Sequence, residues 1–260
     1  MIVTPNFTIF GRRYSLPLTT EYQLILDTAT SLGYTLPSPG QQIMDNNKIY
    51  LLKQEGLWNE LEVLYVFQRS SSESDFAKLN WKSPTQYRLT GTNQPTFNNA
   101  NGFMGNGTNQ YFQTGFIPST MATKALVNNT SIFAGFYNAG TAGTIMGTRN
   151  NAMNNFMWQT GNAILQGSTL VHPGGATIGH THIVKNGTTH NRYRDGVLNG
   201  TDTYTSTTLS SFELTLFGWN LAGTVGQFFN GGIRYIGMGS GSPMEAKQLK
   251  LYQIMNDIMI

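Results

Sequence analysis

Three histidines in the middle of the chain are the residues best suited, by type and spacing, to bind a metal ion. His180 and His182 lie two residues apart, so on a β-strand both side chains project from the same face. A third imidazole on that face would complete the ligands of a zinc site. The strand pairing expected for residues 180–201 places His190 on the opposite face. We therefore predict ordinary polar strand histidines and no metal site.

Glu60 and Glu62 are the carboxylates whose spacing comes nearest to acid–base chemistry. They share one side of a predicted strand, and hydrolysis of glycosidic bonds requires paired carboxylates. They lie at the edge of that strand, however, and no third acidic residue accompanies them on it. The chain also has no cysteine, no G-x-S-x-G elbow and no phosphate-binding loop. The sequence therefore predicts a protein that is not an enzyme.

Residues 180–201 predict a three-stranded antiparallel meander. Asn186-Gly187 and Asp195-Gly196 are two-residue turn signals, and each tolerates the positive φ of a type I′ turn. Around the first turn we expect Lys185 opposite Thr188, and around the second Arg194 opposite Val197. Alternation along the strands then assigns the faces. The expected core face holds His182, Val184, Tyr193 and Leu198, and the expected solvated face holds Lys185, His190, Arg192, Arg194 and Asn199.

The solvated face is a candidate ligand-binding surface. Arginine and asparagine side chains are suited to hydrogen-bond sugar hydroxyls or acidic groups. Aromatic platforms usually accompany sugar recognition, and Trp158 or Trp219 could provide one, although core packing is the favoured interpretation of both. An ordinary solvated sheet face is the alternative interpretation of the same five residues.

Composition excludes several classes of partner. Charged residues make up only 11% of the 260 residues, and the net charge is +3. The lysines and arginines are scattered, so we expect no nucleic-acid binding. No stretch approaches the roughly 20 apolar residues of a membrane helix. The N-terminus lacks the basic and apolar regions of a signal peptide.

The first 58 residues predict an arm and two helices. Residues 1–18 are expected to form an extended arm that docks on a neighbouring subunit through Phe7, Ile9, Phe10 and Tyr14, or else a frayed terminus. Residues 19–58 predict a helical lead-in. Its first helix begins with a capping box at Thr20 and stops at Gly33, and its second has proline at the first position after Ser38. The second helix is expected to break near Asn46-Asn47.

Residues 59–260 predict a β-sandwich that ends in a helix. Leu61 to Phe67, LEVLYVF, suits a buried strand. Many short segments with glycine or asparagine between them follow, which is typical of a sandwich or jelly roll. Ser242 to Met259 combines a capping box with apolar residues at helical spacing. The fold class is therefore mainly β.

Two sets of motifs resemble known families. Arg194 to Thr201 (RDGVLNGT), Leu216 to Asn220 (LFGWN) and Phe229 to Gly239 (FNGGIRYIGMG) resemble the closing strands of laminin-G and concanavalin A-like jelly-roll sandwiches. This resemblance covers about residues 60–260. A narrower resemblance, to virion proteins of tailed phages of Bacteroidetes-type hosts, rests on Leu52 to Phe67 (LKQEGLWNELEVLYVF), Leu79 to Pro84 (LNWKSP), Asn93 to Phe97 (NQPTF) and Gly102 to Thr108 (GFMGNGT).

The resemblances imply a structural or host-contact role in a phage particle. They imply capsid or tail subunits as partners, a homo-oligomer in the particle, and possible contact with host surface glycans. The absence of a signal peptide fits a virion protein made in the host cytoplasm. Laminin-G-like domains often bind calcium, for which Asp195 and Asp202 are candidates, but Asp195 is better explained by its turn. We expect no cofactor. A glycan-degrading enzyme of the same fold and a secreted carbohydrate-binding module are the alternatives.

Overall fold

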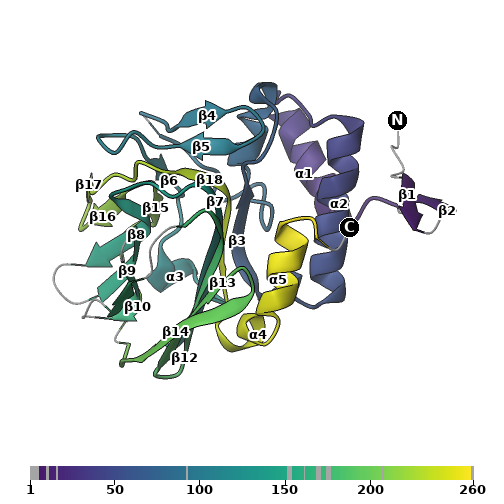
Figure 1. The fold of residues 1–260 in the computed structure, drawn as a ribbon. Coiled ribbons are helices and arrows are strands. Elements are labelled where there is room, and N and C mark those ends of the chain that lie inside the picture. The colour runs from purple at the N-terminus through teal and green to yellow at the C-terminus, as the bar shows by residue number, and fades with distance from the viewer. Residues whose placement is uncertain are drawn as a thin grey trace.

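Two curled β-sheets face each other, and helices cover the outer face of one of them (Figure 1). The structure is a computed structural model, and the predicted mainly-β sandwich of jelly-roll type with helices at both ends is confirmed. It describes residues 6–9, 12–15, 17–91, 93–150, 154–160, 162–167, 171–173, 177–206 and 208–258.

The first sheet carries the meander and the longest strands. In spatial order it consists of β14 (Val197–Thr203), β13 (Thr189–Arg194), β12 (Gly179–Asn186), β7 (Asn129–Asn138), β18 (Gly232–Gly239), β5 (Gly102–Met104) and β4 (Thr96–Asn98). Strand β3 (Leu61–Val66) also pairs with β18, in antiparallel register. Every strand pair described in this sheet is antiparallel.

The second sheet lies across the core from the first. Its order is β11 (Val171–Pro173), β10 (Asn162–Gly167), β9 (Asn154–Gln159), β8 (Thr144–Asn150), β15 (Thr215–Leu216) and β6 (Phe112–Gln113). A small hairpin of β16 (Trp219–Leu221) and β17 (Thr224–Gly226) joins it through β8. Short helical turns connect the strands: η1 (Trp58–Glu60), η2 (Ser71–Glu73), η3 (Phe76–Lys78) and α3 (Pro118–Met121).

Aromatic side chains fill the space between the sheets. Phe103 packs edge-on against Phe112, with ring centroids 4.8 Å apart, and Phe136 packs edge-on against Trp158 at 5.3 Å. All four are buried. Burying one such side chain contributes about 1.5–3 kcal/mol before the entropy of ordering is subtracted. This layer is the main core, and the loops at its ends are held in place by it.

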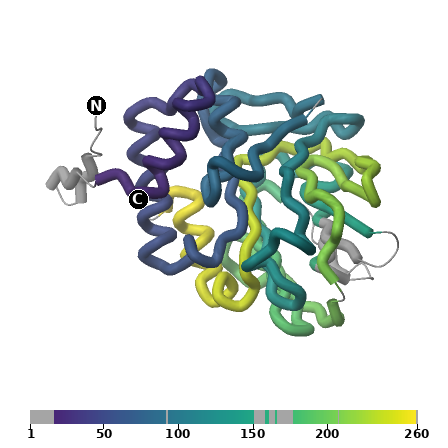
Figure 2. Tube along the Cα trace, turned by 180° about the vertical axis from the view of Figure 1, so that it is seen from behind, coloured from purple at the N-terminus to yellow at the C-terminus, as the bar shows by residue number. Residues whose placement is uncertain are grey.

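A second core lies between the first sheet and the helices. Helices α1 (Thr20–Ser31), α2 (Pro39–Gln54), α4 (Ser242–Glu245) and α5 (Gln248–Met255) form the covering layer, which Figure 2 shows from behind. Leu64, Phe133 and Tyr235 project from the sheet into this core. Because both faces of the central strands are covered, LEVLYVF is apolar almost throughout and does not alternate.

The two predicted N-terminal helices are confirmed, with small corrections at their ends. The N-cap of α1 is Thr19, one residue before the predicted start, and its side chain accepts the N–H of Tyr22. Ser38 caps α2 with proline at the first helical position, as predicted. Helix α2 runs unbroken through Asn46, because that residue is buried and its side-chain oxygen accepts the N–H of Thr19.

The N-terminal arm contains a β-hairpin. Strand β1 (Asn6–Ile9) pairs with β2 (Arg12–Ser15), and Phe7 lies opposite Tyr14 in the register. Figure 1 draws the hairpin beyond α2, on the helical side of the molecule. Phe10 lies outside the described residues. Docking of the arm on a neighbouring subunit remains a prediction.

The meander is present, but its first register is shifted by two residues. Lys185 pairs with His190 and not with Thr188, because the loop consists of Gly187 and Thr188 and is closed by Asn186 and Thr189. A shift of two keeps every side chain on its predicted face. The second turn is as predicted, with positive φ at Asp195 and Gly196. A β-bulge after Tyr193 then places Arg192 opposite Gly200 instead of Asn199.

Candidate functional site

The expected solvated face of the meander is partly buried. Lys185 and His190 are at most 1% exposed. The Lys185 amino group lies 3.8 Å from the centre of the Tyr204 ring and donates to the carbonyl oxygens of Thr188 and Tyr204. Burial lowers the pKa of Lys185 to about 8. The prediction that both residues face solvent is wrong, because this face of β12 points inward and Tyr204 bridges it to Leu165 of the second sheet.

Arg192, Arg194 and Asn199 remain accessible at the sheet edge. Arg192 donates to the side-chain and main-chain oxygens of Asn199. Arg194 donates to the carbonyl oxygen of Ile178 at 3.1 Å. Hydrogen bonds within the protein therefore use part of the donor capacity of both guanidinium groups. A ligand-binding role for Arg192, Arg194 and Asn199 remains a prediction. It no longer includes Lys185 and His190, which are buried.

The expected core face of the meander is correct for β12 and wrong for β14. His182 and Val184 are buried beneath the helical layer, whereas Leu198 is 53% exposed because β14 is the edge strand beyond the helices. Tyr193 is half-buried, and its hydroxyl donates to Glu245 at 2.8 Å.

Neither tryptophan forms an exposed platform. Trp158 is fully buried against Phe136 in the main core. Trp219 is 7% exposed, and the Arg149 guanidinium lies 5.1 Å from the centre of its ring. The core-packing interpretation therefore holds for Trp158, and Trp219 is covered by a protein cation.

The carboxylates considered for catalysis serve the protein's own backbone. Glu62 accepts the main-chain N–H groups of Thr123, Lys124 and Ala125 at 2.6–3.2 Å. Glu60 accepts the hydroxyl of Ser240 at 2.7 Å. Each carboxylate therefore orders a loop, and neither points into a cavity that the structure describes.

The histidines and the calcium candidates do not converge on one site. His180 and His182 face the helical layer, while His190 lies on the opposite face of the sheet, as predicted, although that face is buried. Asp195 sits in the turn before β14 and accepts the His180 N–H at 2.8 Å, whereas Asp202 lies near the far end of β14. At about 3.3 Å per residue, the two carboxylates are too far apart to bind one ion. Within the described part of the chain, no three His, Asp or Glu side chains are grouped as metal ligands would be.

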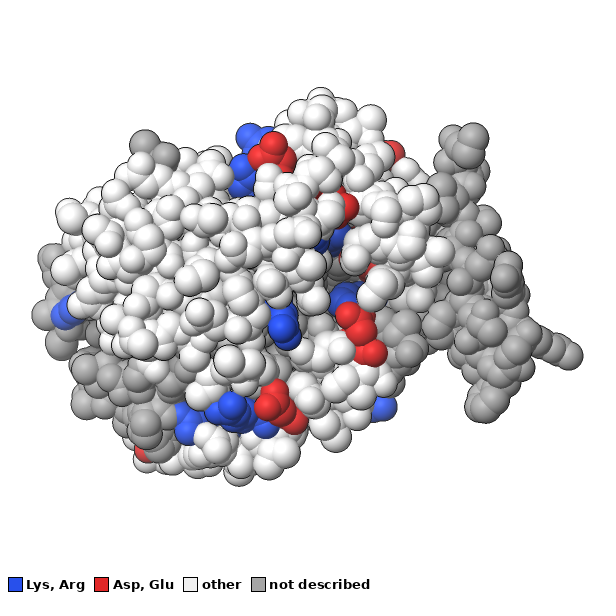
Figure 3. Space-filling view, turned by 45° about the horizontal axis from the view of Figure 1, so that its top comes forward, with Lys and Arg blue, Asp and Glu red and all other residues white. Residues whose placement is uncertain are grey.

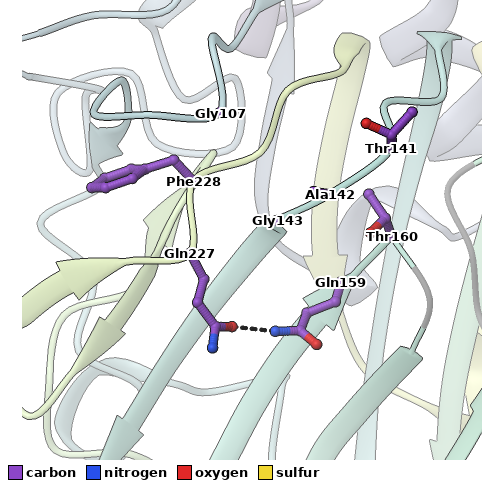
Figure 4. Close-up of a pocket in the computed structure, with 8 residues that line it drawn as sticks. All are labelled: Gly107, Thr141, Ala142, Gly143, Gln159, Thr160, Gln227 and Phe228. Carbon is purple, nitrogen blue, oxygen red and sulfur yellow. Dashed lines mark hydrogen bonds between the residues drawn. The ribbon is translucent and has the colours of Figure 1, made fainter.

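An open cavity at one end of the sandwich is the best candidate for a binding site. Its volume is about 570 Å³. Loops of both sheets form it: the β7–β8 loop, the β9–β10 turn, the segment before β18 and the segment after β5. Figure 4 shows the residues that line it: Gly107, Thr141, Ala142, Gly143, Gln159, Thr160, Gln227 and Phe228.

Backbone hydrogen bonds fix these loops to one another. The Thr144 N–H donates to the carbonyl oxygen of Gln227 at 2.7 Å, and the Thr160 N–H donates to that of Gly143 at 3.1 Å. The side-chain oxygen of Asn230 accepts the N–H groups of Thr141 and Ala142 at 2.7 and 3.0 Å. The cavity walls are therefore held in place before any ligand arrives.

Two glycines allow the walls to approach this closely. Gly143 has φ of +96°, and a Cβ there would lie 2.0 Å from the carbonyl oxygen of Phe228. Gly107 has φ of +73°, and its Cβ would lie 2.9 Å from that of Asn230. Both positions combine a left-handed backbone with a lack of space for a side chain.

Gln159 and Gln227 point toward each other across the cavity and share a hydrogen bond (Figure 4). The amide nitrogen of Gln159 donates to the side-chain oxygen of Gln227 and to the buried hydroxyl of Thr144 at 3.3 Å. The carbonyl oxygen of Gln159 and the amino group of Gln227 lie on either side of this hydrogen bond and take no part in it (Figure 4). The pair therefore presents one acceptor and one donor for a ligand.

The remaining lining residues are also uncharged. Thr141 and Thr160 contribute hydroxyls, and the half-buried ring of Phe228 lies beside the cavity, next to Tyr111. Figure 3 shows that neutral side chains also dominate one whole face of the molecule. Amides, hydroxyls and an aromatic ring can bind a hydroxyl-rich ligand. They include no group able to exchange protons near neutral pH.

Sequence reasoning did not identify this cavity. Its polar residues lie in three loops that are far apart in the chain, and none belongs to a known motif. The available signal was the abundance of glycine in residues 139–143 and 226–232, which indicates close approach of backbone segments.

No protein-family model matches this sequence, and no curated protein is significantly similar to it. Several solved structures share part of its fold. The CBM40 domain of the Ruminococcus gnavus IT-sialidase is 14% identical, with a TM-score of 0.42 over 58% of this chain and 95% of that one. Domain 4 of AbnA, a GH43 arabinanase from Geobacillus stearothermophilus, is 14% identical, with a TM-score of 0.39 over 74% and 98%.

The receptor-binding domain of botulinum neurotoxin D is 14% identical, with a TM-score of 0.47 over 78% of this chain and 54% of that one. This chain spans 27% of the matched sialidase NanB. At such low similarity, the function of this chain has to be inferred from its own residues.

Proposed function

We propose that this protein is a non-enzymatic β-sandwich that binds a glycan in the cavity between Gln159, Gln227 and Phe228. The observation that carries the proposal is the composition of the cavity, which combines two amides and two threonine hydroxyls, with the aromatic ring of Phe228 beside them. Sugars expose hydroxyls that both donate and accept hydrogen bonds, and their C–H faces pack on aromatic rings. The cavity is open and its walls are fixed, as contact with a polymer requires.

The same cavity argues against hydrolysis. Cleavage of a glycosidic bond requires two carboxylates on either side of the bond. The eight lining residues include no carboxylate. Glu60 and Glu62, the pair with suitable spacing, hold Ser240 and the loop at Thr123 instead.

Direct binding measurements test this proposal. Calorimetric titration with purified surface polysaccharides of candidate hosts should show saturable binding without release of reducing ends. The double variant Gln159→Ala, Gln227→Ala should lose binding and keep its melting temperature. Gln86→Ala, an exposed glutamine in another loop, is the matched control. Unchanged binding by the double variant would exclude this cavity, and turnover of any polysaccharide would exclude a non-enzymatic role.

We also propose that the protein is a structural component of a tailed-phage particle, in the capsid decoration or the tail. This part rests on the resemblance of residues 52–67, 79–84, 93–97 and 102–108 to virion proteins, and on the extended N-terminal arm. Its partners would be other virion subunits, including copies of itself. Mass spectrometry and immunogold labelling of purified particles would test it, and absence of the protein from particles would refute it.

A further inference from the structure

The paired amides define which sugars the cavity can accept. One N–H of Gln159 is bound to the oxygen of Gln227, so one donor group, the amino group of Gln227, and one acceptor, the carbonyl oxygen of Gln159, remain on either side of that bond. The result does not depend on how the two amides are oriented, because reversing both exchanges only the positions of donor and acceptor. The buried hydroxyl of Thr144 bonds to both side chains and restrains them.

We propose that Gln159 and Gln227 select an uncharged sugar by engaging two adjacent hydroxyl groups. This inference rests on the proposed glycan-binding function of the cavity. One hydroxyl donates to the carbonyl oxygen of Gln159, and its neighbour accepts from the amino group of Gln227. The ligand class is therefore a neutral polysaccharide with free vicinal hydroxyls.

Acidic sugars do not fit this arrangement. A carboxylate or sulfate group offers only acceptor oxygens, so one of them would face the carbonyl oxygen of Gln159 without a hydrogen atom between them. The lining residues also include no lysine or arginine to pair with the negative charge. A buried or half-buried anion without a partner is unfavourable.

The half-buried ring of Phe228 provides a second determinant. Figure 4 shows the ring on the opposite side of its chain segment from the glutamine pair. Tyr111 supports it, with ring centroids 6.0 Å apart. A chain of at least two sugar units would therefore be needed to reach both the amides and the ring.

The selectivity is tested with neutral polysaccharides and their sulfated derivatives. Dextran, mannan and galactan, each with its sulfated form, are titrated by calorimetry at fixed ionic strength. At least one neutral polymer should bind, and sulfation of that polymer should weaken binding about tenfold or more. Gln227→Glu, which replaces the free donor with an acceptor, should weaken binding of the neutral polymer by a similar factor. Gln86→Glu adds the same charge elsewhere and should have no effect.

The outcomes separate this inference from the function on which it rests. Binding that is confined to sulfated polymers would overturn the selectivity and leave glycan binding in place. Binding of a neutral polymer that Gln227→Glu does not alter, but Phe228→Ala abolishes, would also overturn the role of the amide pair alone. No binding of any polymer would overturn the proposed function itself.

Discussion

Buried charged residues connect the helical layer to the first sheet. The Arg69 guanidinium donates to the Asp45 carboxylate at 2.8 Å, and both side chains are fully buried. Tyr22 and Gln41 also donate to Asp45, and the guanidinium lies 5.3 Å from the centre of the Trp81 ring. Each group thereby offsets part of the cost of burying the other.

Removing one partner of this pair should destabilise the protein strongly. Asp45→Ala leaves the buried Arg69 charge with only the more distant Glu73 carboxylate, 3.9 Å away, which should cost about 3–5 kcal/mol. Glu21→Ala, which breaks the exposed Glu21–Lys53 pair, should cost less than about 1 kcal/mol. Urea unfolding of the two variants provides the comparison. Equal losses would show that the buried pair has no special role.

The histidines beneath helix α5 should make stability depend on pH. Burial lowers the pKa of His182 to about 3 and holds the pKa of His180 well below 6.5. His180 contacts Tyr235 and Tyr252, and within the described residues neither ring nitrogen of His182 has a hydrogen-bond partner.

Both histidines are neutral in the folded protein and bind protons when it unfolds below pH 6.5. Stability is therefore full above pH 6.5 and falls as the pH is lowered from 6.5 toward 3, by about 1.4 kcal/mol per pH unit for each histidine well below 6.5. Urea unfolding of the wild type and His182→Gln at pH 5.0 and 7.5 isolates one contribution. Parallel behaviour of the two proteins would contradict the assignment.

At the level of elements, the backbone requires glycine at one position in a cavity loop but not at a position in helix α2. Gly143 lies in the β7–β8 loop with a left-handed backbone and no room for a Cβ. Gly40 lies in the first turn of α2, and nothing would contact an added Cβ within 4 Å. A side chain would therefore clash at Gly143 and would be accommodated at Gly40.

Gly143→Ala should therefore lower the melting temperature and reduce binding at the cavity. Displacement of the Phe228 backbone and the left-handed φ should together cost more than about 1 kcal/mol. Gly40→Ala should be neutral or stabilising by up to about 1 kcal/mol. Thermal unfolding followed by circular dichroism measures both, and a harmless Gly143→Ala would show that the loop adapts.

At the scale of the whole molecule, the helices and the first sheet bury the second core between them. Leu64 and Phe133 are covered by the helical layer, together with Tyr235. The outer apolar face of the first sheet is therefore buried only when the helices from both ends of the chain are in place.

In the described residues, no helix is long and apolar enough to cross a membrane.

Deletions from the N-terminus should separate the arm from the helical layer. A chain that starts at residue 59 exposes the outer face of the first sheet and should aggregate or unfold. A chain that starts at residue 17 keeps Thr19, which donates to Asn46 of α2 and caps α1, and should melt close to the full-length protein. Light scattering and thermal unfolding distinguish these results. A soluble, folded chain from residue 59 would show that the sandwich is independent.

Local signals in the sequence determined the elements. Caps at Thr19 and Ser38, the glycine stop at Gly33 and the Asp195-Gly196 turn are short-range features, so a single sequence predicts them closely. Strand alternation also divided the side chains of β12 and β13 correctly between the two faces of the sheet despite the register shift of two residues, although it did not show which faces are buried.

Tertiary structure alone decided which faces are buried and where the cavity lies. Alternation cannot show that both faces of β12 are covered, because the covering groups, such as Tyr204 and helix α5, are distant in sequence or on another element. Lys185 was therefore expected in solvent although it is buried. Gln159 and Gln227 are brought together by backbone pairing of separate loops. The spacing of residues along the chain does not indicate this contact, because the contact depends on how the two sheets pack against each other.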